Sequence, residues 1–170
     1  MELRVPEKLE TERLWLRQFR EPDWRDLHEY YSDESATSYT FGRKLSEADT
    51  WRILCGMLGH WAARGYGPYA VEEKASGVVL GTVGFWFPLD WPEPEIKWAL
   101  AARHWGKGFA KEAALAVLAA GREHLRDIRL ISMIHPENTP SIRLAEAMGA
   151  RYEYSVDYED KPHHVYRHSY

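Results

Sequence analysis

The segment Arg103-His104-Trp105-Gly106-Lys107-Gly108-Phe109-Ala110 decides the fold, because it places two glycines between a predicted strand and a predicted helix. Before it, residues 95–101 alternate, with Ile96, Trp98 and Leu100 on one face, which is typical of a strand. After it, apolar side chains recur at helical spacing. A glycine turn that leads into a helix presents free backbone N–H groups and the positive end of the helix dipole, so the segment predicts an anion site.

Two common nucleotide-binding motifs do not fit this turn. A P-loop requires Lys and then Ser or Thr after its second glycine, whereas Phe109 and Ala110 follow Gly108. A dinucleotide fingerprint requires Gly or Ala three positions after that glycine, where this chain has Lys111. The next strand also ends, in Ile-Ser-Met-Ile-His, without the acidic residue that would hold a ribose. The turn therefore predicts an anion site of another kind.

The rest of the chain alternates predicted strands and helices, with no repeat, low-complexity tract or long linker. Ser46 with Asp49 resembles a capping box, and Gly149 is a typical helix stop. These elements predict one mixed α/β domain over residues 1–170. Strands are predicted at residues 13–19, 69–73, 78–87, 95–101, 129–134, 151–158 and 163–170, and helices at 22–31, 46–64, from the glycine turn to about 125, and at 140–148.

The composition is that of an ordinary globular protein, with 45% apolar and 28% charged residues. The 22 Lys and Arg against 26 Asp and Glu give a net charge of −4, without the basic bias of nucleic-acid-binding proteins. No apolar run has the length of a signal peptide or membrane span, and the single cysteine, Cys55, cannot form an internal disulfide. We therefore expect a soluble cytoplasmic protein that contacts neither nucleic acid nor membrane.

The string Arg103-x-x-Gly106-x-Gly108-x-Ala110 resembles the coenzyme A pyrophosphate loop of the GNAT acetyltransferases. The stretches from Leu9 to Phe19 and from His104 to Ala113 resemble the Rim-type branch of that family, the ribosomal-protein-alanine acetyltransferases. Asn138-x-x-Ser141, followed by Gly149, is similar to the last motif of that branch. The resemblance runs from about Leu9 to the end of the chain. It implies the GNAT fold, a mixed sheet in which two central parallel strands splay apart around the cofactor.

The resemblance implies that residues 95–101 and 129–134 are the splayed strands, and that acetyl-CoA binds between them. Backbone groups from Trp98 to Leu100 would pair with its pantetheine arm, and N–H groups from Arg103 through Phe109 would hold its pyrophosphate. The residues expected to bind the cofactor are Trp98, Ala99, Leu100, Arg103, Trp105, Gly106, Lys107, Gly108, Phe109, Ala110, Asn138 and Ser141. The implied reaction is direct attack of a primary amine on the thioester.

This reaction requires a base, because a lysine-like ammonium has a pKa of about 10.4 and must lose a proton before it attacks. Glu95, at the start of a splayed strand, is the predicted base, directly or through water, with Glu93 in reserve. A solvated strand-end carboxylate is the alternative interpretation. Many family members carry a proton-donating Tyr four residues after Ser141, where this chain has Ala145. Ser141 itself is therefore the predicted acid, and a helix-capping serine is the alternative.

The sequence leaves the acceptor open between a protein N-terminus, a polyamine, an aminoglycoside and an amino-acid-like metabolite, and it leaves the oligomeric state open as well. The aromatic segment 85–91 is expected to cover the acceptor site. His163, His164 and His168 lack the spacing of a zinc site, so no metal is predicted. The alternative function is a domain that senses acyl-CoA without catalysis, which the missing tyrosine at position 145 and the choice between two bases leave open.

Overall fold

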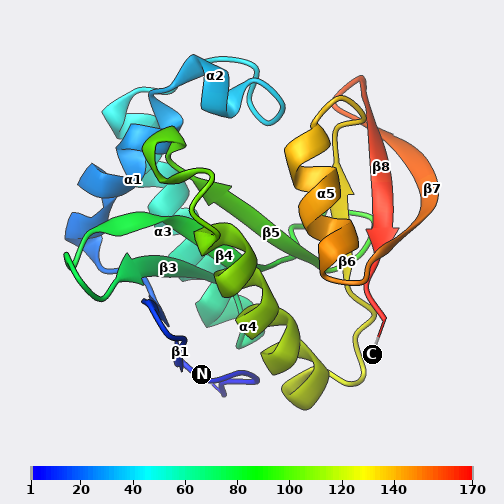
Figure 1. The fold of residues 1–170 in the computed structure, drawn as a ribbon, viewed down its shortest axis with the longest axis horizontal. Helices are drawn as coiled ribbons and strands as arrows, with labels where there is room; N and C mark the ends of the chain where they lie inside the picture. The colour runs from blue at the N-terminus through cyan, green and yellow to red at the C-terminus, as the bar shows by residue number, and fades with distance from the viewer. Residues whose placement is uncertain (1, 170) are drawn as a thin grey trace.

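The computed structural model describes residues 2–169, which form one eight-stranded sheet flanked by helices (Figure 1). The strands lie in the order β1-β2-β3-β4-β5-β6-β8-β7, and all neighbours are antiparallel except β5 and β6. The mixed α/β fold expected from the sequence is therefore confirmed. In chain order the elements are β1 (Lys8–Glu10), β2 (Leu14–Arg17), the 3-10 turn η1 (Glu21–Asp23), α1 (Trp24–Tyr31), α2 (Glu34–Thr37), α3 (Glu47–Arg64), β3 (Pro68–Glu73), β4 (Val79–Trp86), β5 (Glu95–Leu100), the 3-10 turn η2 (Ala102–His104), α4 (Phe109–His124), β6 (Ile131–Ile134), α5 (Thr139–Ala147), β7 (Arg151–Tyr158) and β8 (Lys161–Arg167).

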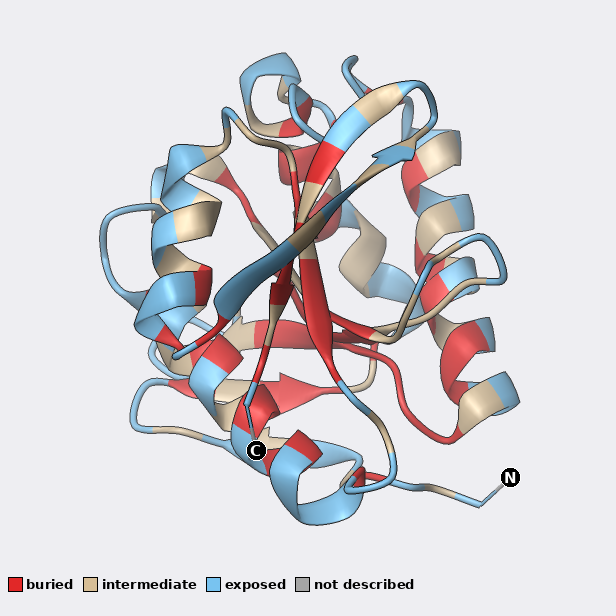
Figure 2. Ribbon diagram, turned by 90° about the vertical axis from the view of Figure 1, so that its right-hand side faces the viewer, coloured by how far each residue is buried: buried red, intermediate tan, exposed pale blue. Residues whose placement is uncertain are grey.

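Helices cover both faces of the sheet near its middle. Helix α4 packs on β4 and β5 from one face, whereas α1 contacts β4 and α3 on the other, and α5 lies beside β6 (Figure 1). The predicted apolar stripe of α4 is buried, and it packs in a cluster with the sheet residues Phe85 and Ile96. Figure 2 shows buried positions concentrated in the central strands and on the sheet-facing sides of the helices. The core therefore lies on both faces of the central strands and supports β5 from each side.

The helix ends follow local sequence signals. The Ser46 side chain accepts the Asp49 N–H at 3.1 Å at the start of α3. Gly65 ends that helix with a φ of +72°, a left-handed conformation that glycine adopts without strain. Pro140 lies in the first turn of α5, where its missing N–H is no loss. The predicted Ser46 cap is therefore confirmed, and the predicted stop Gly149 follows the end of α5 with a φ of +85°.

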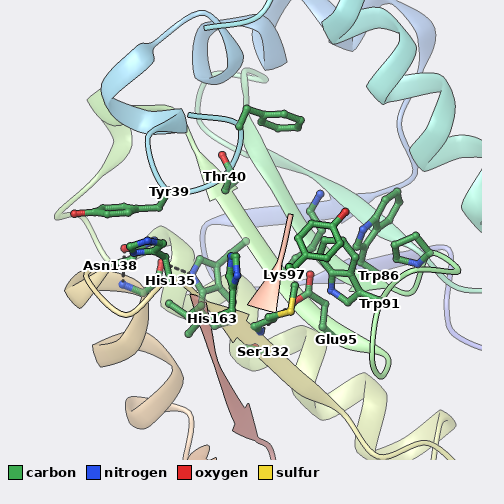
Figure 3. A pocket seen from close by; sticks show the side chains of 18 of the residues that line it. Tyr39, Thr40, Trp86, Trp91, Glu95, Lys97, Ser132, His135, Asn138 and His163 are labelled. Carbon is green, nitrogen blue, oxygen red and sulfur yellow. Dashed lines mark hydrogen bonds between the residues drawn. The ribbon is translucent and has the colours of Figure 1, made fainter. Parts of the chain in front are cut away.

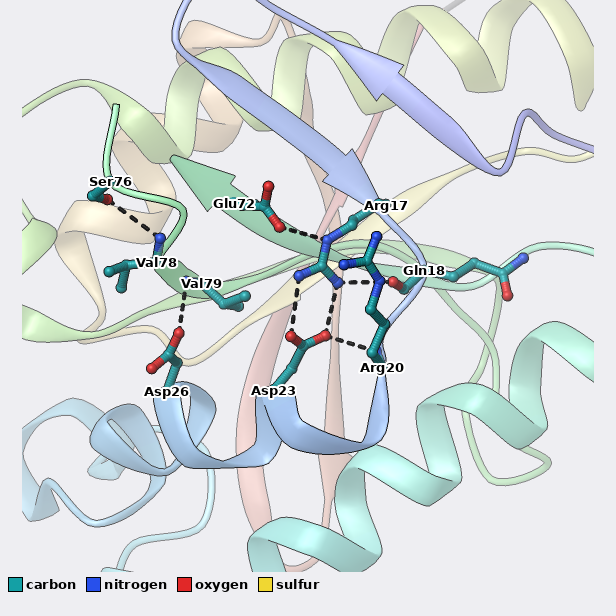
Figure 4. Close-up of polar contacts among 9 residues, drawn as sticks. All are labelled: Arg17, Gln18, Arg20, Asp23, Asp26, Glu72, Ser76, Val78 and Val79. Atoms are coloured by element: carbon teal, nitrogen blue, oxygen red, sulfur yellow. Dashed lines mark hydrogen bonds and ion pairs between the residues drawn. The ribbon is translucent and has the colours of Figure 1, made fainter. Parts of the chain in front are cut away.

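Arg17 is buried, with 8% of its surface exposed, and it links the start of α1 to the sheet (Figure 4). Its Nη1 donates to Asp23 at 2.7 Å and its Nε donates to Glu72 of β3 at 2.6 Å. Further along α1, Asp26 accepts the Val79 N–H of β4 at 2.9 Å. These bonds fix the position of α1, which forms one wall of the cavity described below.

Two short elements depart from the predicted pattern. The strand predicted at residues 13–19 is confirmed as the shorter β2. The edge strand β1 before it was not predicted, because its three residues, Lys-Leu-Glu, are too few for an alternating pattern. Helix α2 is capped by Asp33 and is too short for a periodic signal. The last predicted strand, 163–170, begins earlier and ends at Arg167, and Tyr170 lies outside the described residues. The other predicted elements are confirmed, with ends shifted by at most two residues.

Candidate functional site

The parallel strands β5 and β6 share one backbone pair, Glu95 with Ile131, and then diverge. At this pair the Ile131 N–H donates to the Pro94 carbonyl at 3.0 Å. One residue later the Ser132 hydroxyl reaches across and donates to the Ile96 carbonyl at 2.7 Å. Beyond that point β5 continues beside β4, and β6 beside β8. The splayed pair expected from the sequence is therefore confirmed.

The opening between the strands exposes the backbone of β5 at Trp98. The Ile96 carbonyl points toward β6, where it meets Ser132, and the Leu100 carbonyl accepts the Trp105 indole N–H at 2.7 Å. Backbone groups alternate in direction along a strand, so Trp98, midway between these two residues, directs its own N–H and C=O toward the opening. A strand edge of this kind can pair with an extended ligand.

The glycine turn before α4 is open to a ligand. Gly106 and Gly108 have φ values of +72° and +81°, a region that side-chain-bearing residues rarely adopt. A Cβ at Gly106 would meet no heavy atom within 4 Å. Within residues 2–169, the backbone N–H groups of Gly106, Lys107 and Gly108 donate to no protein acceptor. Because α4 begins at Phe109, these free donors lie at the positive end of its dipole.

Arg13, a cation that the motif does not include, lies beside this turn. The Arg13 guanidinium donates to the Lys107 carbonyl at 2.9 Å, and it lies 3.4 Å from the position of a Cβ at Gly108. Both arginines near the turn are ion-paired, Arg13 with Glu112 of α4 at 2.7 Å and Arg103 with Glu29 of α1 at 2.9 Å. Arg13 comes from the start of β2, so only the packing of that strand beside α4 brings it to the turn.

Three predicted site residues, Trp98, Asn138 and Ser141, meet at the N-terminus of α5. Asn138 caps this helix, and its Oδ1 accepts the Ser141 N–H at 3.4 Å. The Trp98 indole N–H donates to the Ser141 hydroxyl oxygen at 3.1 Å. The indole therefore occupies a lone pair of that oxygen, and the hydroxyl hydrogen stays free for another acceptor. Ala145 is fully buried and adds no polar group.

Glu95 lies where the strands separate, on the opposite face of β5 from Trp98. Its side chain is 5% exposed, and its Oε2 accepts the Met133 N–H at 3.1 Å. Burial raises the pKa of Glu95 to about 7, although the Met133 N–H, the Lys97 charge and the Trp91 indole lower it. The carboxyl group can thus exchange a proton near neutral pH, as a general base requires.

Glu95 opens onto a cavity of about 470 Å³ on the α1 and α3 side of the sheet (Figure 3). Asn138 and Ser141 line the same cavity, so the predicted base and the predicted acid share one space. Part of the aromatic segment 85–91, including Trp86 and Trp91, forms its wall. Further aromatic rings come from α1, the loop after α2 and the β7–β8 hairpin, namely Tyr30, Tyr31, Phe41 and Tyr158.

Two contacts join cavity-lining segments that lie far apart in the chain. The Tyr39 ring stacks on His135 at a centroid distance of 5.1 Å, which joins the loop after α2 to the loop after β6. The Tyr158 hydroxyl donates to Asp90 at 2.8 Å, and its ring meets Trp91 edge-on at 4.6 Å. Sequence reasoning missed Tyr39, His135 and Tyr158, because no local pattern links loops that are so far apart in the chain.

Lys97 is a further cavity residue to which the sequence assigned no role. It lies two positions after Glu95 on the same face of β5, and its Nζ is 4.9 Å from the Trp86 ring centroid. Burial lowers the pKa of Lys97, whereas the neighbouring Glu95 raises it. Strand alternation was the signal that could have paired these two residues.

Glu93, the reserve base, lies in a different environment. It accepts hydrogen bonds from Arg167 at 2.8 Å and from the Tyr154 hydroxyl at 3.1 Å. These bonds and the Arg167 charge lower the pKa of Glu93. Glu93 is not among the described residues that line the cavity.

The three C-terminal histidines do not gather at one point. His163 lines the cavity, whereas His168 is buried and shares a hydrogen bond of 2.9 Å with Ser132. In the described part of the chain, no group of three or more His, Cys, Asp or Glu side chains is arranged to hold a metal ion. Over the same residues, no helix combines the length and the apolar character needed to cross a membrane.

Comparison with known proteins identifies the family. Residues 13–151 match the family described as Acetyltransferase (GNAT) domain. The uncharacterized N-acetyltransferase p20 of Bacillus licheniformis is 33% identical over 156 residues, which span 90% of this chain and 88% of that protein. The crystal structure of an acetyltransferase from Agrobacterium tumefaciens superposes with a TM-score of 0.86 at 28% identity, and covers 98% of this chain and 95% of its own.

A ribosomal-protein-S5-alanine acetyltransferase from Vibrio fischeri superposes with a TM-score of 0.73, covering 94% of each chain. At 17% identity this likeness concerns the fold alone. The family match, by contrast, spans most of the chain and includes the glycine turn, the splayed strands and the start of α5. The chain belongs to the GNAT acetyltransferase family.

Proposed function

We propose that this acetyltransferase transfers the acetyl group of acetyl-CoA to the primary amine of an acceptor. The observation that carries the proposal is the opening between β5 and β6, which leads into a cavity lined by both Glu95 and Ser141. When bound, acetyl-CoA would supply a thioester carbonyl activated toward an amine. Glu95 as the base, Ser141 as the acid and the backbone N–H of Trp98 as a donor would then lie around one cavity.

The residues around the glycine turn fit a pyrophosphate. The unpaired N–H groups of Gly106, Lys107 and Gly108 and the dipole of α4 favour a doubly charged anion. Lys107 and Arg13 add positive charge beside them. The backbone from Trp98 to Leu100 lines the opening and would pair with the pantetheine arm.

Glu95 would take the proton from the acceptor ammonium, directly or through a water molecule. Its pKa of about 7 lets it ionise at neutral pH and still hold a proton. One of its oxygens is held by Met133, which leaves the other for the acceptor. Glu93 is the weaker candidate, because Arg167 and Tyr154 stabilise its ionised form.

Ser141 and Trp98 would act on the thioester side. The backbone N–H of Trp98 faces the opening and can stabilise negative charge on the thioester carbonyl oxygen. Such a donor typically contributes about 100-fold or more to turnover. The Ser141 hydroxyl can donate its free hydrogen to the departing thiolate. The N-terminus of α5, capped by Asn138, favours the same negative charge.

We place the chain in the Rim-type branch on the stretches from Leu9 to Phe19 and from His104 to Ala113. We also propose that it acts in the cytoplasm. With Cys55 as its one cysteine, the sequence offers no internal disulfide that would point to an oxidising compartment.

The proposal is tested by incubating the purified chain with acetyl-CoA and a panel of primary amines. A thiol reagent follows the release of CoA, and mass spectrometry detects the acetylated amine. We expect release that depends on the amine and falls in the Glu95→Gln variant. Binding of CoA without release for any amine would contradict transfer and would favour the acyl-CoA-sensing alternative.

A further inference from the structure

Lys97 places an ammonium group in the cavity with no anion in direct contact, although the Glu95 charge acts on it from two residues away. Its Nζ contacts the face of Trp86, but within residues 2–169 it forms no ion pair and no hydrogen bond. A half-buried cation without a partner is costly, because burial removes the water that would otherwise solvate it. A bound anionic group would remove that cost.

Glu95 lies on the same face of the strand and has the opposite charge when ionised. The Glu95 carboxylate turns toward Met133 of β6, and the Lys97 ammonium turns toward Trp86 of β4. The two charged groups therefore lie toward opposite sides of β5, where an amine and a carboxylate joined through one carbon can lie between them. Glu95 and Lys97 therefore match the two charged groups of an amino acid.

The walls of the cavity define the rest of the ligand. Tyr31, Trp86 and Trp91 surround the two charged groups, and Met57 adds a further apolar side chain. The volume of about 470 Å³ lies within the range of small-molecule sites. Such a wall favours an apolar or aromatic side chain over a polar one.

Two contacts between lining residues favour a small acceptor over a protein N-terminus. The stack of Tyr39 on His135 and the packing of Tyr158 on Asp90 and Trp91 each join two segments of the cavity wall. A polypeptide substrate would have to separate these contacts to bring its first residue to Glu95.

We propose that the acceptor is a free amino acid with an apolar or aromatic side chain, whose carboxylate binds Lys97 and whose amine faces Glu95. This inference rests on the proposed acetyl transfer and specifies its acceptor. A polyamine or an aminoglycoside fits the cavity less well, because a second ammonium group would lie against the Lys97 charge in a site of low dielectric. The Lys97 charge would also lower the pKa of the acceptor amine and so favour its attacking form.

The test compares leucine, methionine and phenylalanine with their amides, which keep the amine and side chain but lack the carboxylate. We expect the acid to exceed the amide in kcat/KM by at least tenfold for one pair or more. In Lys97→Met, which removes the charge and keeps the apolar stem, the ratio should fall close to one. Lys161→Met is the matched control, because Lys161 lines the cavity from β8, and it should keep the wild-type ratio.

The outcomes separate this inference from the proposed function. If spermidine, a short peptide or the amides are the best acceptors, acetyl transfer stands and the amino-acid acceptor is wrong. A ratio lost in Lys161→Met but kept in Lys97→Met would also overturn the assignment of the carboxylate site. If no amine is acetylated, calorimetry of the same acids with CoA-loaded protein still decides, since acids that bind wild type and Lys97→Met equally would refute the role of Lys97.

Discussion

The Trp98 indole N–H donates to the Ser141 hydroxyl oxygen at 3.1 Å, so one hydrogen bond crosses the opening from β5 to α5. On the side away from the opening, β5 pairs with β4 and β6 pairs with β8. The Trp98–Ser141 bond is therefore a link between the two halves of the sheet that also orients a candidate catalytic hydroxyl.

Replacement of Ser141 by Ala should lower kcat by about 100-fold while the KM for acetyl-CoA changes little, because a donor to a leaving group typically acts in the transition state alone. Asn138→Ala should instead affect both constants, since it removes the cap that positions the start of α5. Steady-state kinetics at saturating amine distinguishes the two. Full turnover in Ser141→Ala would reduce Ser141 to a helix-capping residue.

Replacement of Trp98 by Phe removes the indole N–H and keeps an aromatic ring. We expect a fall of a few-fold in kcat, because the Ser141 hydroxyl loses the bond that orients it. The double variant with Ser141→Ala should be no slower than Ser141→Ala alone, since residues acting through one hydroxyl are not additive. Additive losses would show that Trp98 acts independently of Ser141.

Replacement of Gly108 by Asp should weaken CoA binding by at least tenfold, as calorimetry would measure. The φ of +81° makes any side chain at this position strained, by roughly 1–2 kcal/mol, so Gly108→Ala is the control for strain alone. The aspartate adds a negative charge beside the free N–H groups of the turn. Equal CoA affinity in the two variants, both folded, would mean that the anion binds elsewhere.

The pH dependence of turnover should follow the ionisation of Glu95. The pKa of about 7 predicts that kcat/KM rises with pH up to about 7, because the base must be deprotonated. In Glu95→Gln the rate should fall about 100-fold and that rise should disappear. A wild-type pH profile in Glu95→Gln would move the role of base to Glu93 or to water.

Glu95 should also make the free energy of unfolding depend on pH. The raised pKa of Glu95 means that the native state holds a proton which the unfolded state loses above its ordinary pKa of 4.5. The free energy of unfolding should therefore fall between about pH 4.5 and pH 7 through this group. Glu95→Gln should weaken this fall, because Gln cannot ionise and can still accept the Met133 N–H. Thermal unfolding across that pH range measures the difference.

Replacement of Asp23 by Ala should strongly destabilise the fold, because it leaves the buried Arg17 charge without its bidentate partner (Figure 4). Removing one member of a buried ion pair typically costs about 3–5 kcal/mol, or roughly 6–20 °C in Tm for a domain of this size. Asp127→Ala is the matched control, since its ion pair with Arg4 is exposed and is expected to contribute less than about 1 kcal/mol. Equal Tm shifts would show that burial does not govern the Arg17 network.

The strand, glycine turn and helix around Gly108 could be predicted from the sequence because each depends on spacing within a short segment. Alternation set the faces of β5, glycines permitted the positive φ values, and an apolar stripe marked α4. The edge strand β1 escaped prediction, because its pairing with β2 depends on hydrogen bonds rather than on an apolar pattern.

The chemistry of the cavity depended on tertiary structure. The sequence predicted Glu95 as the base and left a solvated strand-end carboxylate as the alternative, whereas its pKa near 7 arises from burial against elements from both halves of the chain. The proposed role of Lys97 depends on the fold, which places its ammonium over Trp86 with no anion in direct contact. The sequence by itself determined which residues face together along one strand or helix. Only the tertiary structure decided how much water each charge keeps, and desolvation is what sets its reactivity.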